Sequence, residues 1–195
     1  MVWVVVAVVV VLLLAVGVLL ARQHRSRRLK EGFGPEYDRV MAKQGDQRAA
    51  EKELLERRRR HDKFEIRPLE ASAREEYRQR WETLQRRFVD QPDATVGQAS
   101  VLVRQVMRDR GYPVDVDFEQ VADDISVAHP VVVENYRAAH AISARASNGQ
   151  ASTEDLRRAL VHFRALFAEL LGGGESTRQD APKREEMQHR ATTAG

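Results

Sequence analysis

The chain has 195 residues, with 32 lysines and arginines against 29 aspartates and glutamates and no cysteine. The missing cysteine excludes a disulfide framework, a thiol nucleophile and a thiolate metal site. Residues 31–195 carry 27 basic and 29 acidic side chains, a balance of −2 that is unlike a general nucleic-acid-binding surface, so we predict no nucleic-acid partner.

The first 21 residues contain no charged side chain. Residues 2–21, as an α-helix, would rise about 30 Å, which matches the hydrocarbon thickness of a membrane. A cleavable signal peptide has a positive start, a shorter apolar stretch and a small-residue cleavage site, and this segment fits that pattern poorly. The sequence therefore predicts a transmembrane helix at 1–21, with a secreted protein released by cleavage as the alternative.

Basic residues lie on only one side of this apolar segment. No lysine or arginine precedes it, and five follow within ten residues. The positive-inside rule then places the N-terminus outside and the large C-terminal part in the cytoplasm. The same cations would contact anionic lipid headgroups. The predicted membrane-interface residues are Arg22, Arg25, Arg27, Arg28 and Lys30.

Residues 22–63 are predicted to form a basic juxtamembrane segment and a charged helix. The sequence Gly34-Pro35-Glu36 is typical of a helix start, because proline suits the first helical position. We expect one long, largely exposed helix to about Asp62, or two collinear helices broken at Gly45-Asp46. The basic run 57–60 favours a solvated, ion-paired helix surface. Contact with anionic lipid, or with the acidic segment described below, remains as an alternative for this run.

Residues 64–171 are predicted to form a small helical bundle, because apolar residues recur there with helical spacing. Expected helix starts are Asp93, Asp117 and a capping box from Ser152 to Asp155. The run of glycines at 172–174 is expected to end the last helix, and residues 172–195 are predicted to be a disordered tail. The apolar stripes comprise Tyr77, Trp81, Leu84 and Phe88; Val96, Ala99, Val103, Val106 and Met107; Phe118, Val121 and Ile125; Val132, Tyr136, Ala139 and Ile142; Leu156, Leu160, Phe163, Phe167 and Leu170.

The known catalytic and metal-binding patterns are missing from the sequence. There is no phosphate-binding glycine loop and no nucleophile elbow. A calcium-loop start at Asp115 fails, since Gln120 replaces the required glycine and Ser126 the required glutamate. Glu186 and His189 have the spacing of a metal-binding pair, but a di-iron site needs a second such pair and the sequence has none. We therefore predict a protein that is not an enzyme, with no catalytic residue, no cofactor and no metal.

Between residues 111 and 136 the chain has six acidic residues and no lysine or arginine. Some of these acids are expected to cap helices, and together they form a candidate surface for a basic partner. A second hypothesis is a ligand-binding or regulatory domain with a pocket near Tyr136, His140 and His162. The candidate partner surface comprises Asp115, Asp117, Glu119, Asp123 and Asp124.

Several short motifs together resemble an uncharacterised bacterial family of membrane-anchored or secreted helical proteins. The resemblance covers most of residues 30–171 and implies a hydrophobic N-terminal segment, a charged helix and a small helical domain, with no known activity. The resemblance leaves both membrane anchoring and secretion open, and the apolar segment with its flanking cations favours the bacterial inner membrane as the location. The matching segments are 33–39 (FGPEYDR), 66–69 (IRPL), 87–90 (RFVD), 110–113 (RGYP), 124–130 (DISVAHP) and 133–137 (VENYR).

The sequence therefore favours a single-pass membrane protein whose cytoplasmic helical domain is a non-catalytic adaptor or scaffold. Its partners would be membrane lipids, through residues 2–21 and the basic residues that follow, and another protein. The patterns do not specify whether the chain forms homo-oligomers.

Overall fold

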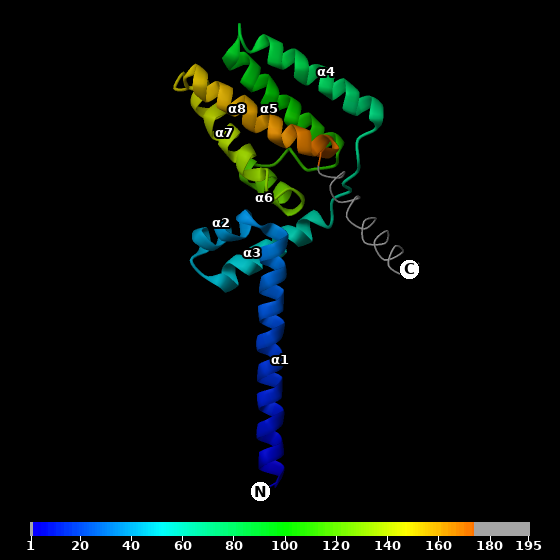
Figure 1. The fold of residues 1–195 in the computed structure, drawn as a ribbon, viewed down its shortest axis with the longest axis vertical. Helices are drawn as coiled ribbons and strands as arrows, with labels where there is room; N and C mark the ends of the chain where they lie inside the picture. Colours follow the sequence, from blue (N-terminus) through cyan, green and yellow to red (C-terminus); the bar gives the residue numbers. More distant parts are fainter. Residues whose placement is uncertain (1, 174–195) are drawn as a thin grey trace, which may run out of the picture. The chain divides into compact units, whose positions relative to one another are not determined.

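A computed structural model describes residues 2–173 of the chain, except for the side chains of residues 4–11, 15, 18 and 22. The described residues form helices, turns and irregular segments without a strand, so the prediction of an all-α fold is confirmed (Figure 1). The chain divides into two compact units, Met1–Asp62 and Lys63–Gly195. The predicted disordered tail lies outside the described residues from residue 174 onward.

The first unit contains α1 (Val2–Phe33), α2 (Pro35–Gln44) and α3 (Gln47–His61). Helix α1 runs without a break, so the apolar segment and the basic residues that follow it belong to one helix. Within the part of the chain that the structure describes, no helix has both the length and the hydropathy of a membrane span. The α1 end is followed at once by Gly34, whose positive φ of 47° redirects the chain before Pro35 starts α2.

The expectation of one long helix, or two collinear ones, after residue 35 is wrong. Gly45 adopts a left-handed conformation with φ 66°, and its N–H donates to the Met41 carbonyl, which closes α2. Asp46 then caps α3, since its carboxylate accepts from the Ala49 N–H at 2.8 Å. The two helices pack against each other as a hairpin (Figure 1). The chain therefore reverses at a left-handed glycine that is followed by a helix cap.

The second unit contains the helical bundle. Its elements are α4 (Ala71–Arg87), α5 (Pro92–Asp109), α6 (Phe118–Ala128), α7 (Val133–Ser147), α8 (Thr153–Ala168) and the π-helical turn η1 (Glu169–Gly173). Helix α8 packs against both α5 and α7, α4 packs against α5, and α6 packs against α7. The prediction of a small helical bundle is confirmed, with α8 as its central helix (Figure 1).

The predicted apolar stripes supply the core of the bundle. Trp81 is 4% exposed and stacks on Phe167 with ring centroids 4.7 Å apart. Phe88 and Phe118 are only partly buried at the edge of the core. Full burial of a large apolar side chain contributes about 1.5–3 kcal/mol, so this cluster is the main stabilising feature of the unit.

Two of the three predicted helix starts are confirmed. Asp117 accepts from the Gln120 N–H at 3.0 Å, and Ser152 and Asp155 form the reciprocal capping box. Asp93 is not an N-cap. Pro92 takes the first helical position of α5 instead, because its fixed φ and missing N–H are tolerated only there, and this moves Asp93 into the first turn. At the other end of the bundle, Gly172 has φ 103° and interrupts the helical geometry inside η1, within the run of glycines expected to end the last helix.

Candidate functional site

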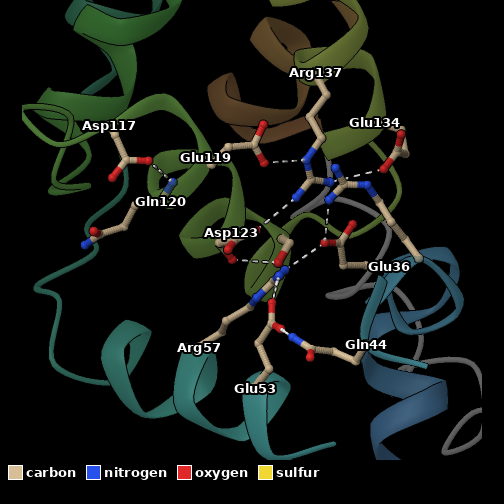
Figure 2. A network of polar contacts seen from close by, with 12 residues as sticks. Glu36, Gln44, Glu53, Arg57, Asp117, Glu119, Gln120, Asp123, Glu134 and Arg137 are labelled. Atoms are coloured by element: carbon tan, nitrogen blue, oxygen red, sulfur yellow. Dashed lines mark hydrogen bonds and ion pairs between the residues drawn. The ribbon is translucent and has the colours of Figure 1, made fainter. Parts of the chain in front are cut away.

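A buried arginine holds the hairpin of the first unit together. The side chain of Arg57, on α3, is 1% exposed, and its Nη1 donates to the Oε1 of Glu36 on α2 at 2.7 Å. Its Nη2 donates to Glu53, one turn earlier on α3. Glu36 has no exposed surface and also lies 3.6 Å from Arg39. Figure 2 shows Arg57 with both carboxylates around its guanidinium.

The polar surroundings of Glu53 favour its ionised form. Burial raises the pKa of Glu53, but hydrogen bonds from Arg57 and Gln44 and the charges of Arg57 and Lys43 outweigh it and lower the pKa below its usual value. The sequence prediction for the run 57–60 therefore holds only in part. Arg59 is exposed, whereas Arg57 is fully buried, because one side of α3 packs against α2.

A second arginine holds the acidic segment of the bundle in place. Arg137, on α7, is 8% exposed and donates from Nη2 to Asp123 Oδ1 at 3.1 Å and from Nη1 to Glu134 Oε1 at 3.1 Å. Its Nε also lies 4.0 Å from Glu119. Figure 2 shows these three carboxylates around one guanidinium. The contact fixes α6 against α7 and offsets part of the negative charge of this segment.

The five predicted partner-surface residues have different environments. Asp115, Asp117 and Glu119 are exposed. Asp115 also lies 3.0 Å from the Nη2 of Arg108, and Asp117 is the α6 cap. Asp123 is half-buried beside the guanidinium described above, and Asp124 is only 1% exposed. Only the first three of these carboxylates therefore lie on the surface.

The predicted membrane-interface residues lie on the last turns of α1 that precede the hairpin. Arg25, Arg27, Arg28 and Lys30 are exposed, and the side chain of Arg22 lies outside the described atoms. On the other side of the same turns, the side chains at positions 29 and 33 are buried. The helix end is therefore amphipathic, with its cations directed toward solvent.

A polar hollow of about 730 Å³ lies between α1 and α3, and the sequence analysis did not predict it. Ser26 of α1 donates to Glu51 of α3, and Gln47 donates to Ser26 at 2.7 Å. Burial raises the pKa of Glu51, but hydrogen bonds from Ser26, Gln47 and Tyr37 and the nearby charge of Arg25 outweigh it, and the pKa is lowered. The hollow is lined by Gln23, Arg25, Ser26, Asp46, Gln47, Arg48, Glu51, Lys52, Leu55, Glu56 and Arg59.

The three residues of the second hypothesis have separate partners. Tyr136 is 3% exposed and packs on Phe118 at 4.9 Å between ring centroids. His162 Nδ1 lies 2.8 Å from the Asn135 Oδ1. His140 lies against Phe118 and lines a hollow of about 370 Å³ whose lining residues do not include Tyr136 or His162. The three side chains do not line a common pocket there.

No group of three or more histidine, cysteine or carboxylate side chains with the geometry of a metal site occurs among the described residues. Comparison with known proteins gives no match to a family model, to a curated protein or to a solved structure. The resemblance carried by the short motifs stays a prediction.

Proposed function

We propose that the chain is a single-pass membrane protein whose helical bundle binds a basic segment of another protein, as a non-catalytic adaptor. The anchor rests on the sequence: residues 2–21 are uncharged and five cations follow them. The bundle would then lie in the cytoplasm of a bacterial cell, attached to the inner membrane.

The partner surface is supported by one observation in particular. Asp115, Asp117 and Glu119 are exposed within five residues of chain, and Val116 between them is 38% exposed. This segment is held firmly, because Asp117 caps α6 and the helix is fixed to α7 by Arg137. A rigid, negatively charged surface with an apolar residue at its centre suits a basic segment with one apolar anchor.

A photo-cross-linking experiment on the full chain tests this surface. A photoreactive residue replaces Val116, the protein is extracted in detergent, and cross-linked products are identified. We expect a discrete product that disappears when Asp115→Asn and Glu119→Gln are combined. The matched control combines Glu75→Gln and Glu82→Gln, two exposed acids of α4, and should leave the product unchanged. An equal yield of the product from both double variants would contradict the proposed surface.

The anchor is tested separately by extraction of membranes with alkaline carbonate. A protein held by a spanning helix stays in the membrane pellet, and a C-terminal alkaline phosphatase fusion should be inactive if the bundle is cytoplasmic. An active fusion would reverse the orientation. Recovery from the medium of a protein that begins near residue 18 or 22 would favour the secreted alternative instead.

A further inference from the structure

The hairpin places α3 beside the end of α1, although at least twenty residues separate the contacting positions. Gln47 donates to Ser26, so the start of α3 lies next to the seventh turn of α1. Further along, the Arg58 guanidinium lies 5.5 Å from the ring centroid of Phe33. Helix α3 therefore follows α1 over its last turns, and the hollow between the two helices is formed by residues from both.

The cations of this hollow outnumber the acids that are free to neutralise them. Four basic side chains line it, Arg25, Arg48, Lys52 and Arg59. Each of the three acids already has a function in the unit: Asp46 caps α3, Glu51 accepts three hydrogen bonds, and Glu56 lies 4.0 Å from Lys52.

Arg48 and Arg59 are exposed, and neither forms an ion pair with any residue in the described part of the chain. They lie eleven residues apart, which places them on one face of α3 but about 16 Å apart along its axis, with Arg48 at the end near Ser26 and Arg59 at the end near Phe33. A guanidinium presents several N–H donors in a plane, and this arrangement matches the oxygens of a phosphate. The first turn of α3 adds the positive end of its dipole at the same hollow.

The hollow begins close to the end of the apolar segment. Gln23 and Arg25 come two and four residues after Ala21, which corresponds to roughly 3 and 6 Å along α1. Both distances are shorter than the Debye length of about 8 Å at physiological salt, so the charges of a membrane surface would act on this site. A single long helix from residue 35 would instead have carried α3 away from that surface.

We propose that the end of this hollow nearest the apolar segment binds the phosphate of an anionic lipid headgroup, with Arg25 contributed by α1 and Arg48 by α3. The proposal rests on the membrane anchor proposed above and adds a specific headgroup site to it. The hairpin is then more than a connector, because it places Arg48, at the start of α3, beside Ser26 and Arg25 of α1, close to the proposed membrane surface.

The test uses the full chain in lipid nanodiscs that contain anionic phosphatidylglycerol and zwitterionic phosphatidylcholine. Native mass spectrometry measures which lipid stays bound after release from the disc. Each cation near an anionic surface changes affinity roughly fivefold, so Arg25→Gln combined with Arg48→Gln should lower the preference for phosphatidylglycerol by more than about tenfold. The control is Arg157→Gln combined with Arg158→Gln, two exposed arginines of α8, which should keep the preference.

Separate results distinguish failure of the site from failure of the anchor. Loss of the wild-type protein from carbonate-washed membranes would contradict the anchor. An anchored wild-type protein with no preference for phosphatidylglycerol, or an equal loss of preference in both double variants, would overturn the headgroup site alone.

Free phosphate is the other source of the same chemistry. Hydrogen exchange of the first turn of α3 should slow when phosphatidylglycerol is added to the nanodiscs and should be unchanged by excess inorganic phosphate. Equal protection by inorganic phosphate would assign the hollow to a soluble anion and overturn the lipid proposal.

Discussion

In the bundle of residues 63–195, the interior is built from aromatic and aliphatic side chains, with Trp81 stacked on Phe167. Among the side chains of residues 1–62 that the structure describes, the largest fully buried one is Arg57, which is held by Glu36 and Glu53. Apolar contacts are non-directional and stabilise over a range of geometries, whereas a buried ion pair is favourable only in one arrangement. The comparison indicates that the bundle is stabilised mainly by apolar burial, whereas the hairpin adds a buried ion pair to its own buried apolar side chains, such as Val40 and Leu54.

The same division appears in the surface charge. Residues 22–62 carry 13 basic and 8 acidic side chains, a net charge of +5, while residues 63–195 carry 19 basic and 21 acidic side chains, a net charge of −2. The positive charge is concentrated in the unit that contains the apolar segment. This distribution suits a lipid-facing unit followed by a protein-facing unit.

The largest expected effect is on the bundle core. Trp81→Ala should lower the free energy of unfolding of the bundle by about 3–5 kcal/mol, because a large buried side chain is removed and a cavity remains. Hydrogen exchange should accelerate in α4, α5 and α8 and stay unchanged in α2 and α3. Equal acceleration of hydrogen exchange in both units would show that they unfold together. The two units would then not be stabilised separately.

The corresponding change in the first unit is Arg57→Met. It leaves Glu36 buried without its closest cation, and a broken buried pair costs about 3 kcal/mol or more. Chemical denaturation combined with hydrogen exchange should show the loss in α2 and α3. The double variant Arg57→Met with Glu36→Leu should recover most of it, since the fully buried carboxylate is removed, while Glu53 is 22% exposed and keeps its hydrogen bond from Gln44. A double variant as unstable as the single one would show that packing, and not charge, specifies the hairpin.

Smaller effects are expected at the helix caps, and here the two units can be compared directly. Asp46 caps α3 and Ser152 caps α8, and replacement of either by alanine should cost about 1 kcal/mol. Thermal unfolding followed by circular dichroism measures both. Glycine at the same positions should cost only a few tenths of a kcal/mol. If alanine and glycine have the same effect, the cap hydrogen bonds are not what stabilises these helix starts.

The smallest expected effect is a dependence of bundle stability on pH. Burial lowers the pKa of His140 below 6.5; the charge of Glu119 opposes this shift and that of Arg104 adds to it. The unfolded chain then binds the proton more readily than the folded one, so stability is full above about pH 6.5 and falls as the pH drops through the folded pKa. His140→Phe should flatten the curve of unfolding free energy between pH 5 and 7, while the first unit stays unaffected.

The bundle was largely predictable from sequence because its signal is local. Residues three and four apart lie on one helix face, so the stripe through Tyr77, Trp81 and Leu84 indicates both the helix and its buried side. The hairpin was not predictable in this way. Gly45-Asp46 is compatible with a kink or a reversal, and the reversal depends on Arg57 meeting Glu36, 21 residues earlier. In the sequence, Arg57 is also indistinguishable from the three arginines that follow it.

The candidate partner surface was predictable only in its composition. The excess of acid from 111 to 136 is plain in the sequence, but burial of Asp124 depends on the packing of α6. The central position of Arg137 could have been inferred from its place three residues after Glu134 and from the i, i+4 pair Glu119 and Asp123. The sequence does not show how α6 packs against α7, and this packing decides which of the acidic side chains are buried.

The uninterrupted course of α1 has a mechanical consequence. Helix α1 is unbroken from Val2 to Phe33. The direction in which the hairpin projects from the helix axis is therefore fixed relative to the apolar segment. One extra residue inserted near position 23 would swing the hairpin by about 100° and lift it by about 1.5 Å, whereas seven extra residues would return it nearly to its starting direction, about 10 Å further along. The continuity of α1 therefore fixes which side of the hairpin faces which side of the apolar segment.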